Sequence, residues 1–219
     1  MRPRLLDLFC GAGGAAVGYH RAGFEVVGVD NQPQPNYPFE FWQTDALAND
    51  YGPWDICDFD AIHASPPCQA YSPLNAYNGK EYPDLVDSVR ALLLQTGLPY
   101  VIENVPQAPL LDPVRLCGPM FGLRIYRHRA FESSVELDTP RHTRHVARCA
   151  RNGYLPNPAA PFMSIHGGRH SKAWVRAAAE QMGVPWMSNV REVCEAIPPA
   201  YTEHIGRFLL AETRAKVAA

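Results

Sequence analysis

The first 30 residues constrain the fold more than any other part of the chain, because two apolar runs flank a glycine-rich turn. Residues 4–9 and 24–30 have the composition of buried strands, and residues 10–14 between them read Cys-Gly-Ala-Gly-Gly before a helix-like run. A glycine turn between strand and helix lets the backbone approach a nucleotide-like ligand closely. The second strand ends at Asp30, whose carboxylate can accept hydrogen bonds from ribose hydroxyls. The turn alone is not the full dinucleotide fingerprint, so the pattern predicts a nucleotide-type site only together with Asp30.

Strand and helix patterns then alternate along the chain. We expect further strands at residues 39–43, 59–64, 98–102, 122–126 and 130–135, and helices at 13–22, 84–96, 171–182, 189–195 and 200–215. Asp84 is expected to cap the second helix. Alternation of this kind predicts an α/β fold with a doubly wound, mostly parallel sheet. With 219 residues and 47% hydrophobic composition, the chain can form one full core and at most a small appendage.

A rigid turn follows the strand expected at 59–64. Pro66 and Pro67 precede Cys68, and two prolines fix two backbone dihedrals, so the thiol is held in one direction at the strand end. In α/β proteins, ligand-binding and catalytic residues usually lie in the loops at the carboxyl ends of parallel strands. Taken alone, Cys68 could equally be a small buried apolar residue.

These motifs together resemble the cytosine-C5 DNA methyltransferases, in the order that this family uses. Residues 7–14 resemble its first S-adenosylmethionine motif, and residues 66–69 (Pro-Pro-Cys-Gln) its nucleophile motif. Residues 103–105 (Glu-Asn-Val) match the motif with the base-binding glutamate, and residues 127–129 (Arg-His-Arg) the paired-arginine motif. Residues 197–201 are similar to the C-terminal motif that returns to the cofactor. The resemblance implies the Rossmann-like fold of S-adenosylmethionine-dependent methyltransferases.

The resemblance also implies roles for individual residues. Cys68 would be the nucleophile, and Glu103 would be the acid at N3 of the base. Arg129 would hold the base, and Arg127 would orient the loop. The cofactor S-adenosyl-L-methionine, leaving as S-adenosyl-L-homocysteine, would contact Phe9, Cys10, Gly11, Ala12, Gly13, Gly14, Asp30, Asn31, Asp45, Ala46, Pro67 and Ala196. The implied reaction transfers a methyl group to C5 of a flipped-out cytosine through a covalent cysteine adduct.

Three positions depart from the family pattern. Cys10 stands where Ala or Ser is usual, and Ile125 where the arginine motif normally opens with glutamine. Glu195 precedes Ala196 where the family usually has Gly-Asn, and a carboxylate there would be repelled by the cofactor carboxylate unless it turns away. The segment after the arginine pair is also unusually short for target recognition.

Charge is strongly segregated along the chain although the net charge is only −2. Residues 1–120 contain 6 Lys/Arg against 14 Asp/Glu, whereas residues 121–179 contain 10 against 3. A basic segment of this kind favours a polyanion partner, with an ordinary solvated face as the alternative. The expected nucleic-acid contacts are Gln69, Ser72, Arg141, Arg144, Arg148, Arg169 and Lys172.

Metal binding is not expected from the spacing. His142, His145 and Cys149 with Cys117 could in principle hold zinc, but the spacing fits no standard pattern, and phosphate or base contacts are favoured. The apolar runs are too short to cross a bilayer. Six cysteines without a disulfide-like spacing, and no secretory signal, suit a cytoplasmic protein.

The expected organisation is a catalytic core at 1–136, an abbreviated recognition element at 137–172 with a hairpin turning at residues 152–153, and C-terminal helices at 173–219 that return to the core. The expected substrate is double-stranded DNA. Two alternatives stay open, namely C5 methylation of RNA such as tRNA, and a non-catalytic protein that binds the cofactor or nucleic acid. A partner subunit or self-association could complete target recognition.

Overall fold

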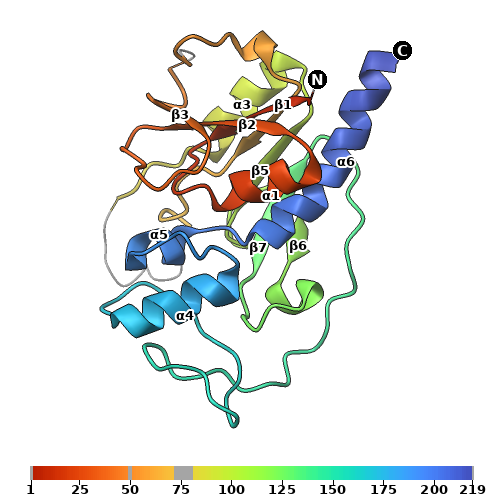
Figure 1. Cartoon of the computed structure of the whole chain (residues 1–219). Helices are drawn as coiled ribbons and strands as arrows, with labels where there is room; N and C mark the ends of the chain where they lie inside the picture. Colours follow the sequence, from red (N-terminus) through yellow and green to blue (C-terminus); the bar gives the residue numbers. More distant parts are fainter. Residues whose placement is uncertain (1, 49–50, 72–80, 219) are drawn as a thin grey trace.

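One seven-stranded sheet forms the centre of the molecule (Figure 1). The computed structural model describes residues 2–48, 51–71 and 81–218. The strands run in the order β3-β2-β1-β4-β5-β7-β6. Their bounds are β1 Arg4–Leu8, β2 Glu25–Asp30, β3 Glu40–Gln43, β4 Ala61–Ala64, β5 Tyr100–Asn104, β6 Val114–Leu116 and β7 Arg129–Ser133. Neighbours from β3 to β5 are parallel, and β7 is antiparallel to both β5 and β6. The predicted α/β, doubly wound and mostly parallel sheet is confirmed.

The strand order reverses at the centre of this sheet. From β1 the chain first moves outward to β2 and β3, and then returns to the other side of β1 to form β4 and β5. The carboxyl ends of β1, β2, β4 and β5 therefore meet at one edge. In open α/β sheets, ligands bind in the crevice at such a reversal point.

Helices cover both faces of the sheet. The α-helices are α1 Gly14–Ala22, α3 Val86–Thr96, α4 Lys172–Met182, α5 Val190–Glu195 and α6 Pro199–Ala218, and the short 3-10 turns are η1 Ile56–Asp58 and η2 Gly118–Phe121. One core packs α1 and α6 against the sheet, around Tyr19 and Tyr201. The opposite core includes Val89 and Leu93 of α3. A third cluster joins α4 and α5 to residues that precede β7, which places these helices beyond the sheet edge (Figure 1).

Two glycines allow α1 and α6 to approach closely. A Cβ added at Gly18 would lie 2.0 Å from Thr202 Oγ1 and 2.2 Å from the Pro199 carbonyl oxygen. Gly206 faces α1 in the same way, with a built Cβ 2.7 Å from that of Ala22. Thr202 Oγ1 also donates a hydrogen bond of 2.8 Å to the Ala15 carbonyl. The C-terminal helix is thereby held against the helix that follows the glycine turn.

Several predicted elements are wrong in detail. Residues 122–126 form no strand; Ile125 makes only an isolated bridge to Met163, while the short strand β6 was not expected. Asp84 does not cap α3, whose first turn follows Leu85 without a side-chain cap, because the Asp84 carboxylate accepts a hydrogen bond from the Tyr71 hydroxyl instead. The chain does turn at residues 151–154, but no hairpin forms there, since the nearby bridge between Cys149 and Phe162 is parallel.

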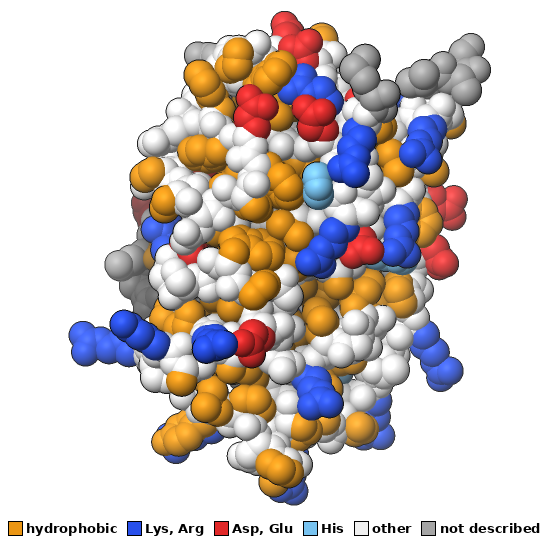
Figure 2. Space-filling model, in the orientation of Figure 1, with side chains coloured by type: hydrophobic (Ala, Val, Ile, Leu, Met, Phe, Trp, Pro, Cys, Tyr) orange, Lys and Arg blue, Asp and Glu red, His pale blue; other side chains and the backbone are white. Residues whose placement is uncertain are grey.

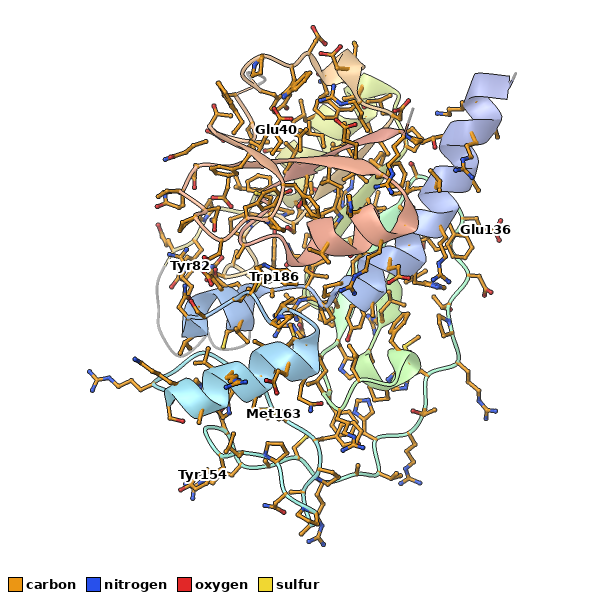
Figure 3. All side chains as sticks on the ribbon, viewed as in Figure 1. Glu40, Tyr82, Glu136, Tyr154, Met163 and Trp186 are labelled. Atoms are coloured by element: carbon orange, nitrogen blue, oxygen red, sulfur yellow. The ribbon has the colours of Figure 1, made fainter. Side chains whose placement is uncertain are left out.

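Residues 137–171 wrap around one end of the molecule as loops, and α4 begins at residue 172 (Figure 1). Met163 and Ile165 are the points at which this segment enters the core beside α4. In Figure 3, Met163 lies just below α4, whereas Tyr154 lies on the outer loop. Across the part of the chain that the structure describes, none of the helices is both long enough and apolar enough to span a membrane.

Replacing Gly18 by alanine should destabilise the fold by about 1–3 kcal/mol, because the new methyl group would push α6 away from α1. Urea denaturation followed by circular dichroism measures the change. Gly167→Ala is the matched control, since a Cβ there meets nothing within 4 Å. Equal midpoints for the two variants would show that the α1–α6 contact is looser than described.

Candidate active site

The glycine-rich turn lies directly at the carboxyl end of β1. Phe9, Gly11 and Gly13 all have positive φ, at 59°, 48° and 83°. The Gly11 N–H donates to Asp30 Oδ2 at 3.0 Å, and the Cys10 N–H donates to the Val29 carbonyl at 3.0 Å. Hydrogen bonds from β2 and its terminal carboxylate therefore shape the turn.

Space beside the turn is open at one glycine and closed at the others. A Cβ added at Gly11 would meet nothing within 4 Å. At Gly13 it would lie 2.6 Å from Pro38 Cδ, and at Gly14 2.5 Å from the Ile197 carbonyl oxygen. Gly11 is therefore the position at which a ligand can approach the backbone, while Gly13 and Gly14 are needed for packing.

The predicted cofactor residues differ in their exposure to solvent. Asn31 and Asp45 are exposed beyond the ends of β2 and β3, whereas Phe9 and Pro67 are half-buried. The buried members are Cys10, Ala12, Gly13, Gly14, Ala46 and Ala196. Asp30 is already engaged, because Oδ1 accepts from the Gln32 N–H at 2.9 Å while Oδ2 accepts from Gly11. Its carboxylate could still accept from ribose hydroxyls through its remaining lone pairs.

The C-terminal segment returns to the glycine turn. Ile197 packs on Gly14, and Trp186 Nε1 donates to the Ala12 carbonyl at 2.9 Å, with Trp186 labelled beside α5 in Figure 3. Glu195 turns away, since its carboxylate is exposed and pairs with Arg191 at 3.2 Å. The Glu195 charge is therefore partly compensated by Arg191.

The Pro-Pro-Cys turn is fastened to both neighbouring strands. The Ser65 N–H donates to the Leu8 carbonyl at 3.1 Å, and Ser65 Oγ donates to the Phe9 carbonyl at the same distance. On the β5 side, Asn104 Nδ2 donates to the Pro66 carbonyl at 3.0 Å. These bonds fix the backbone that carries Cys68 between the glycine turn and the end of β5.

Glu103 and Arg129 form an ion pair on adjacent strands. Arg129 Nε lies 2.8 Å from Glu103 Oε1, and the Glu103 side chain is almost fully buried. Burial raises the pKa of Glu103, against the opposing fields of Arg129 and Arg127. The Glu103 carboxyl is therefore protonated more readily than that of an exposed glutamate.

Arg127 is buried and ties the arginine pair to the C-terminal segment. Its NH2 group donates to the Cys194 carbonyl at 2.6 Å, and its own carbonyl accepts from the Tyr201 hydroxyl at 2.6 Å. Burial, with the adjacent charge of Arg129, lowers the pKa of Arg127 to about 9. Arg127 therefore links the C-terminal segment to the site in addition to contributing positive charge.

Cys68 is half-buried and lies within the field of these three charged groups. Burial raises the pKa of its thiol; Arg129 and Arg127 oppose that shift, and Glu103 adds to it. The thiol is therefore the resting form at neutral pH, and the arginines favour the thiolate.

Two buried polar atoms around the site, Gln69 Oε1 and Arg127 Nε, have no hydrogen-bond partner among the described residues. Glu103 Oε1 makes no regular hydrogen bond either, but it is held in the ion pair with Arg129. Buried polar groups are normally satisfied, so unpaired ones next to Cys68 suit a polar ligand that supplies the missing partners.

The predicted nucleic-acid residues lie on the outer side of the loop segment. Arg141, Arg144, Arg148, Arg169 and Lys172 are all exposed, and Figure 2 shows blue side chains predominating over red ones around the lower half of that face. Gln69 is half-buried beside Cys68, and Ser72 lies outside the described residues. Apolar side chains accompany the basic ones, since Val146 and Tyr154 are 80% and 61% exposed.

Sequence reasoning missed the residues that position the site. Ser65, Asn104, Trp186 and Tyr201 act through hydrogen bonds to backbone carbonyls. Asn104 had a signal, because it belongs to the Glu-Asn-Val motif. Trp186 had none, since its partner Ala12 lies 174 residues away.

Alkylation of Cys68 should report the charges around it. We expect its reaction with iodoacetamide to speed up as the pH rises through the raised thiol pKa, because only the thiolate reacts. Arg129→Gln should slow the reaction at pH 9 several-fold, since it removes the cation that favours the thiolate. Mass spectrometry of the Cys68 peptide measures the rate, and Arg124→Gln, an exposed arginine nearby in sequence, is the control. Equal rates in the two variants would contradict the proximity of Arg129 to Cys68.

Comparison with known proteins agrees with this geometry. Residues 3–108 match the family described as C-5 cytosine-specific DNA methylase. The type II methyltransferase M.AplI of Arthrospira platensis is 24% identical over 93% of this chain, which spans 59% of the length of that relative.

Solved structures share the fold at low identity. A prophage-encoded protein of Escherichia coli, described as a DNA modification methyltransferase, superimposes with a TM-score of 0.61 at 15% identity, covering 97% of this chain and 99% of its own. The Dnmt2 methyltransferase of Schizosaccharomyces pombe superimposes with a TM-score of 0.61 at 15% sequence identity, and the match covers 96% of this chain and 99% of that protein's chain. The family match covers the glycine turn, the Pro-Pro-Cys turn and the Glu-Asn-Val strand end, so the N-terminal part of the chain is similar to the C-5 cytosine-specific DNA methylases in the segments that build this site.

Proposed function

We propose that this protein transfers a methyl group from S-adenosylmethionine to C5 of cytosine in double-stranded DNA. The observation that carries the proposal is the convergence of Cys68, Glu103 and Arg129 beside the glycine turn. They come from the end of β4, the end of β5 and the start of β7, and the Glu103–Arg129 pair measures 2.8 Å. Similarity to the C-5 cytosine-specific DNA methylases supports C5 chemistry, and the choice of DNA is our inference.

The residues around Gly11 fit the cofactor. Gly11 leaves open space beside its backbone, and Asp30 presents a carboxylate at the end of β2 where ribose hydroxyls could donate. When bound, S-adenosylmethionine supplies an electrophilic methyl group. Phe9 at the end of β1 and Pro67 before the nucleophile would enclose the cofactor and align it with Cys68.

Cys68 would act as the nucleophile. C5 of cytosine is a poor nucleophile, and addition of a thiolate at C6 raises electron density at C5 by forming an enamine-like adduct. Arg129 and Arg127 favour the thiolate electrostatically. After methyl transfer, loss of the C5 proton to a base such as water lets the Cys68 thiolate leave again.

Glu103 and Arg129 would stabilise charge that develops on the base. Addition at C6 places negative charge toward N3, and a protonated carboxyl next to N3 lowers that barrier. The raised pKa of Glu103 makes a protonated carboxyl accessible. Arg129 would then donate to the base O2, and the second oxygen of the Glu103 carboxyl could accept from the exocyclic amine.

Residues 137–172 would present the DNA to this site. A base inside a duplex cannot reach Cys68, so the target must be flipped out, as the general rule for DNA methyltransferases states. We propose residues 1–136 as the catalytic core, the exposed basic loops of 137–172 as an abbreviated recognition element, and 173–219 as the returning helices. Gln69 and Ser72, which flank the nucleophile, are proposed as further DNA contacts.

The recognition surface is small for sequence-specific binding. A partner subunit or a second copy of the chain could enlarge it, and restriction-modification would be a natural context, given the type II relative. All six cysteines are free thiols, which supports a reducing, cytoplasmic location.

Replacing Cys68 by alanine should abolish methyl transfer, because no thiol remains to activate the base. Tritiated-methyl transfer to duplex DNA measures the loss, and binding of S-adenosylhomocysteine by calorimetry should stay within a few-fold of wild type. Wild-type enzyme should also form a gel-stable adduct with DNA containing 5-fluorocytosine, which blocks elimination of the enzyme, whereas Cys68→Ala should not.

A matched control is Cys57→Ser, since Cys57 is exposed on η1 away from the site. Turnover surviving in Cys68→Ala would overturn the mechanism. Transfer to tRNA with none to duplex or single-stranded DNA would replace DNA by RNA as the substrate. Cofactor binding without transfer to any of these would favour a non-catalytic protein.

Removing two basic residues from the recognition element should weaken DNA binding and its salt dependence. Arg144→Ala with Arg148→Ala should lower the slope of log affinity against log salt by up to about 2, roughly one per phosphate contact. Fluorescence anisotropy at several salt concentrations measures the slope.

The control is Arg115→Ala, an exposed arginine in the acidic part of the sequence. A smaller fall in slope with relaxed sequence preference would mean that these arginines read base edges. Unchanged slope and unchanged preference would mean that the basic segment is only a solvated face.

A further inference from the structure

Four potential metal ligands from three separate segments meet beside the arginine pair. Cys117 follows β6, His128 lies between Arg127 and Arg129, and His142 and His145 belong to the loop segment. Their ligand atoms all lie within 4.8 Å of one another. The sequence-based prediction of no metal rested on a set with Cys149 in place of His128, and Cys149 is not part of this cluster.

Two distances within the cluster match a tetrahedral zinc site. Cys117 Sγ lies 3.4 Å from His145 Nε2, and His128 Nε2 lies 3.3 Å from His142 Nε2. Zn–S and Zn–N bonds of about 2.3 and 2.0–2.1 Å put neighbouring ligands of a tetrahedron roughly 3.3–3.6 Å apart. Contraction of the remaining distances, from at most 4.8 Å, would close the site.

Contacts around the cluster hold the imidazole rings in place. His145 stacks on Tyr126 at a centroid distance of 3.9 Å. The Tyr126 hydroxyl donates to the Ala147 carbonyl and accepts from the Ala147 N–H, both at 3.0 Å. These two hydrogen bonds fix the backbone two residues beyond His145. Contacts that orient the side chain of a metal ligand strengthen metal binding.

Zinc binding at the cluster would balance in protons and electrons. Ligation displaces the proton of the Cys117 thiol to solvent as the Zn–S bond forms, and no electron is transferred.

We propose that Cys117, His128, His142 and His145 bind one zinc ion that fastens the recognition element to the catalytic core. One thiolate and three imidazoles form a closed, four-ligand set of the structural zinc type. The ion would pin residues 142–145 to the end of β6 and to the backbone between Arg127 and Arg129. Because the loop segment has no strand or helix of its own between residues 137 and 171, such a cross-link would replace the missing secondary structure.

Cobalt substitution tests the site without relying on methyl transfer. Tag-free protein, stripped with a chelator and titrated with Co²⁺, should bind one ion per chain with tetrahedral d–d absorption and a thiolate charge-transfer band. Cys117→Ser should lose the charge-transfer band. Exposed His142, replaced by alanine, should weaken Co²⁺ and Zn²⁺ binding at least about tenfold without disturbing a core.

Cys149→Ser is the matched control, because it removes an exposed thiol four residues after His145 and should leave the spectrum unchanged. A second readout is proteolysis, in which zinc should protect the bonds at Arg141 and Arg144 from trypsin in wild type but not in His142→Ala. The proposal is overturned if wild type binds no more metal than His142→Ala, or if the thiolate band survives in Cys117→Ser and disappears in Cys149→Ser.

Discussion

Parallel pairing of β1 with both β2 and β4 is the constraint on which the rest of the site depends. It brings the glycine turn, Asp30 and the Pro-Pro-Cys turn to one edge of the sheet, although they are far apart in sequence. Hydrogen bonds then hold these pieces together, as when Ser65 donates to the carbonyls of both Leu8 and Phe9. Because each bond joins backbone to backbone or side chain to backbone, the geometry does not depend on exposed, flexible side chains.

The protonation of the ionisable groups in the site depends on burial as well as on ion pairing. Glu103 and Arg129 form a close pair, but both are largely removed from water, which raises the pKa of the acid despite the adjacent cation. Buried pairs of this kind contribute little net stability, so their value here is chemical. The proposed reaction needs a proton near the base and a thiolate at Cys68, and the same two arginines influence both groups.

The C-terminal third completes what the N-terminal motifs begin. Arg127 donates to the Cys194 carbonyl, and α6 packs on α1 through Gly18 and Gly206. The loop segment that lies between these parts in sequence is anchored by Met163 and Ile165, by the hydrogen bonds of Tyr126, and by contacts of Asp138 with His204 and of His166 with Cys194. A zinc ion at the cysteine–histidine cluster would add a cross-link at residues 142–145.

Sequence alone determined the fold class, most element positions and the identities of the motif residues, because strand and helix periodicity and glycine or proline turns are local signals. It placed residues 122–126 in a strand and missed β6, since short edge strands depend on neighbours rather than on their own pattern. Only the tertiary structure decided that Trp186 donates to the Ala12 carbonyl and that His128 joins Cys117, His142 and His145. Those outcomes depend on which distant segments pack together, and no spacing within the chain encodes them.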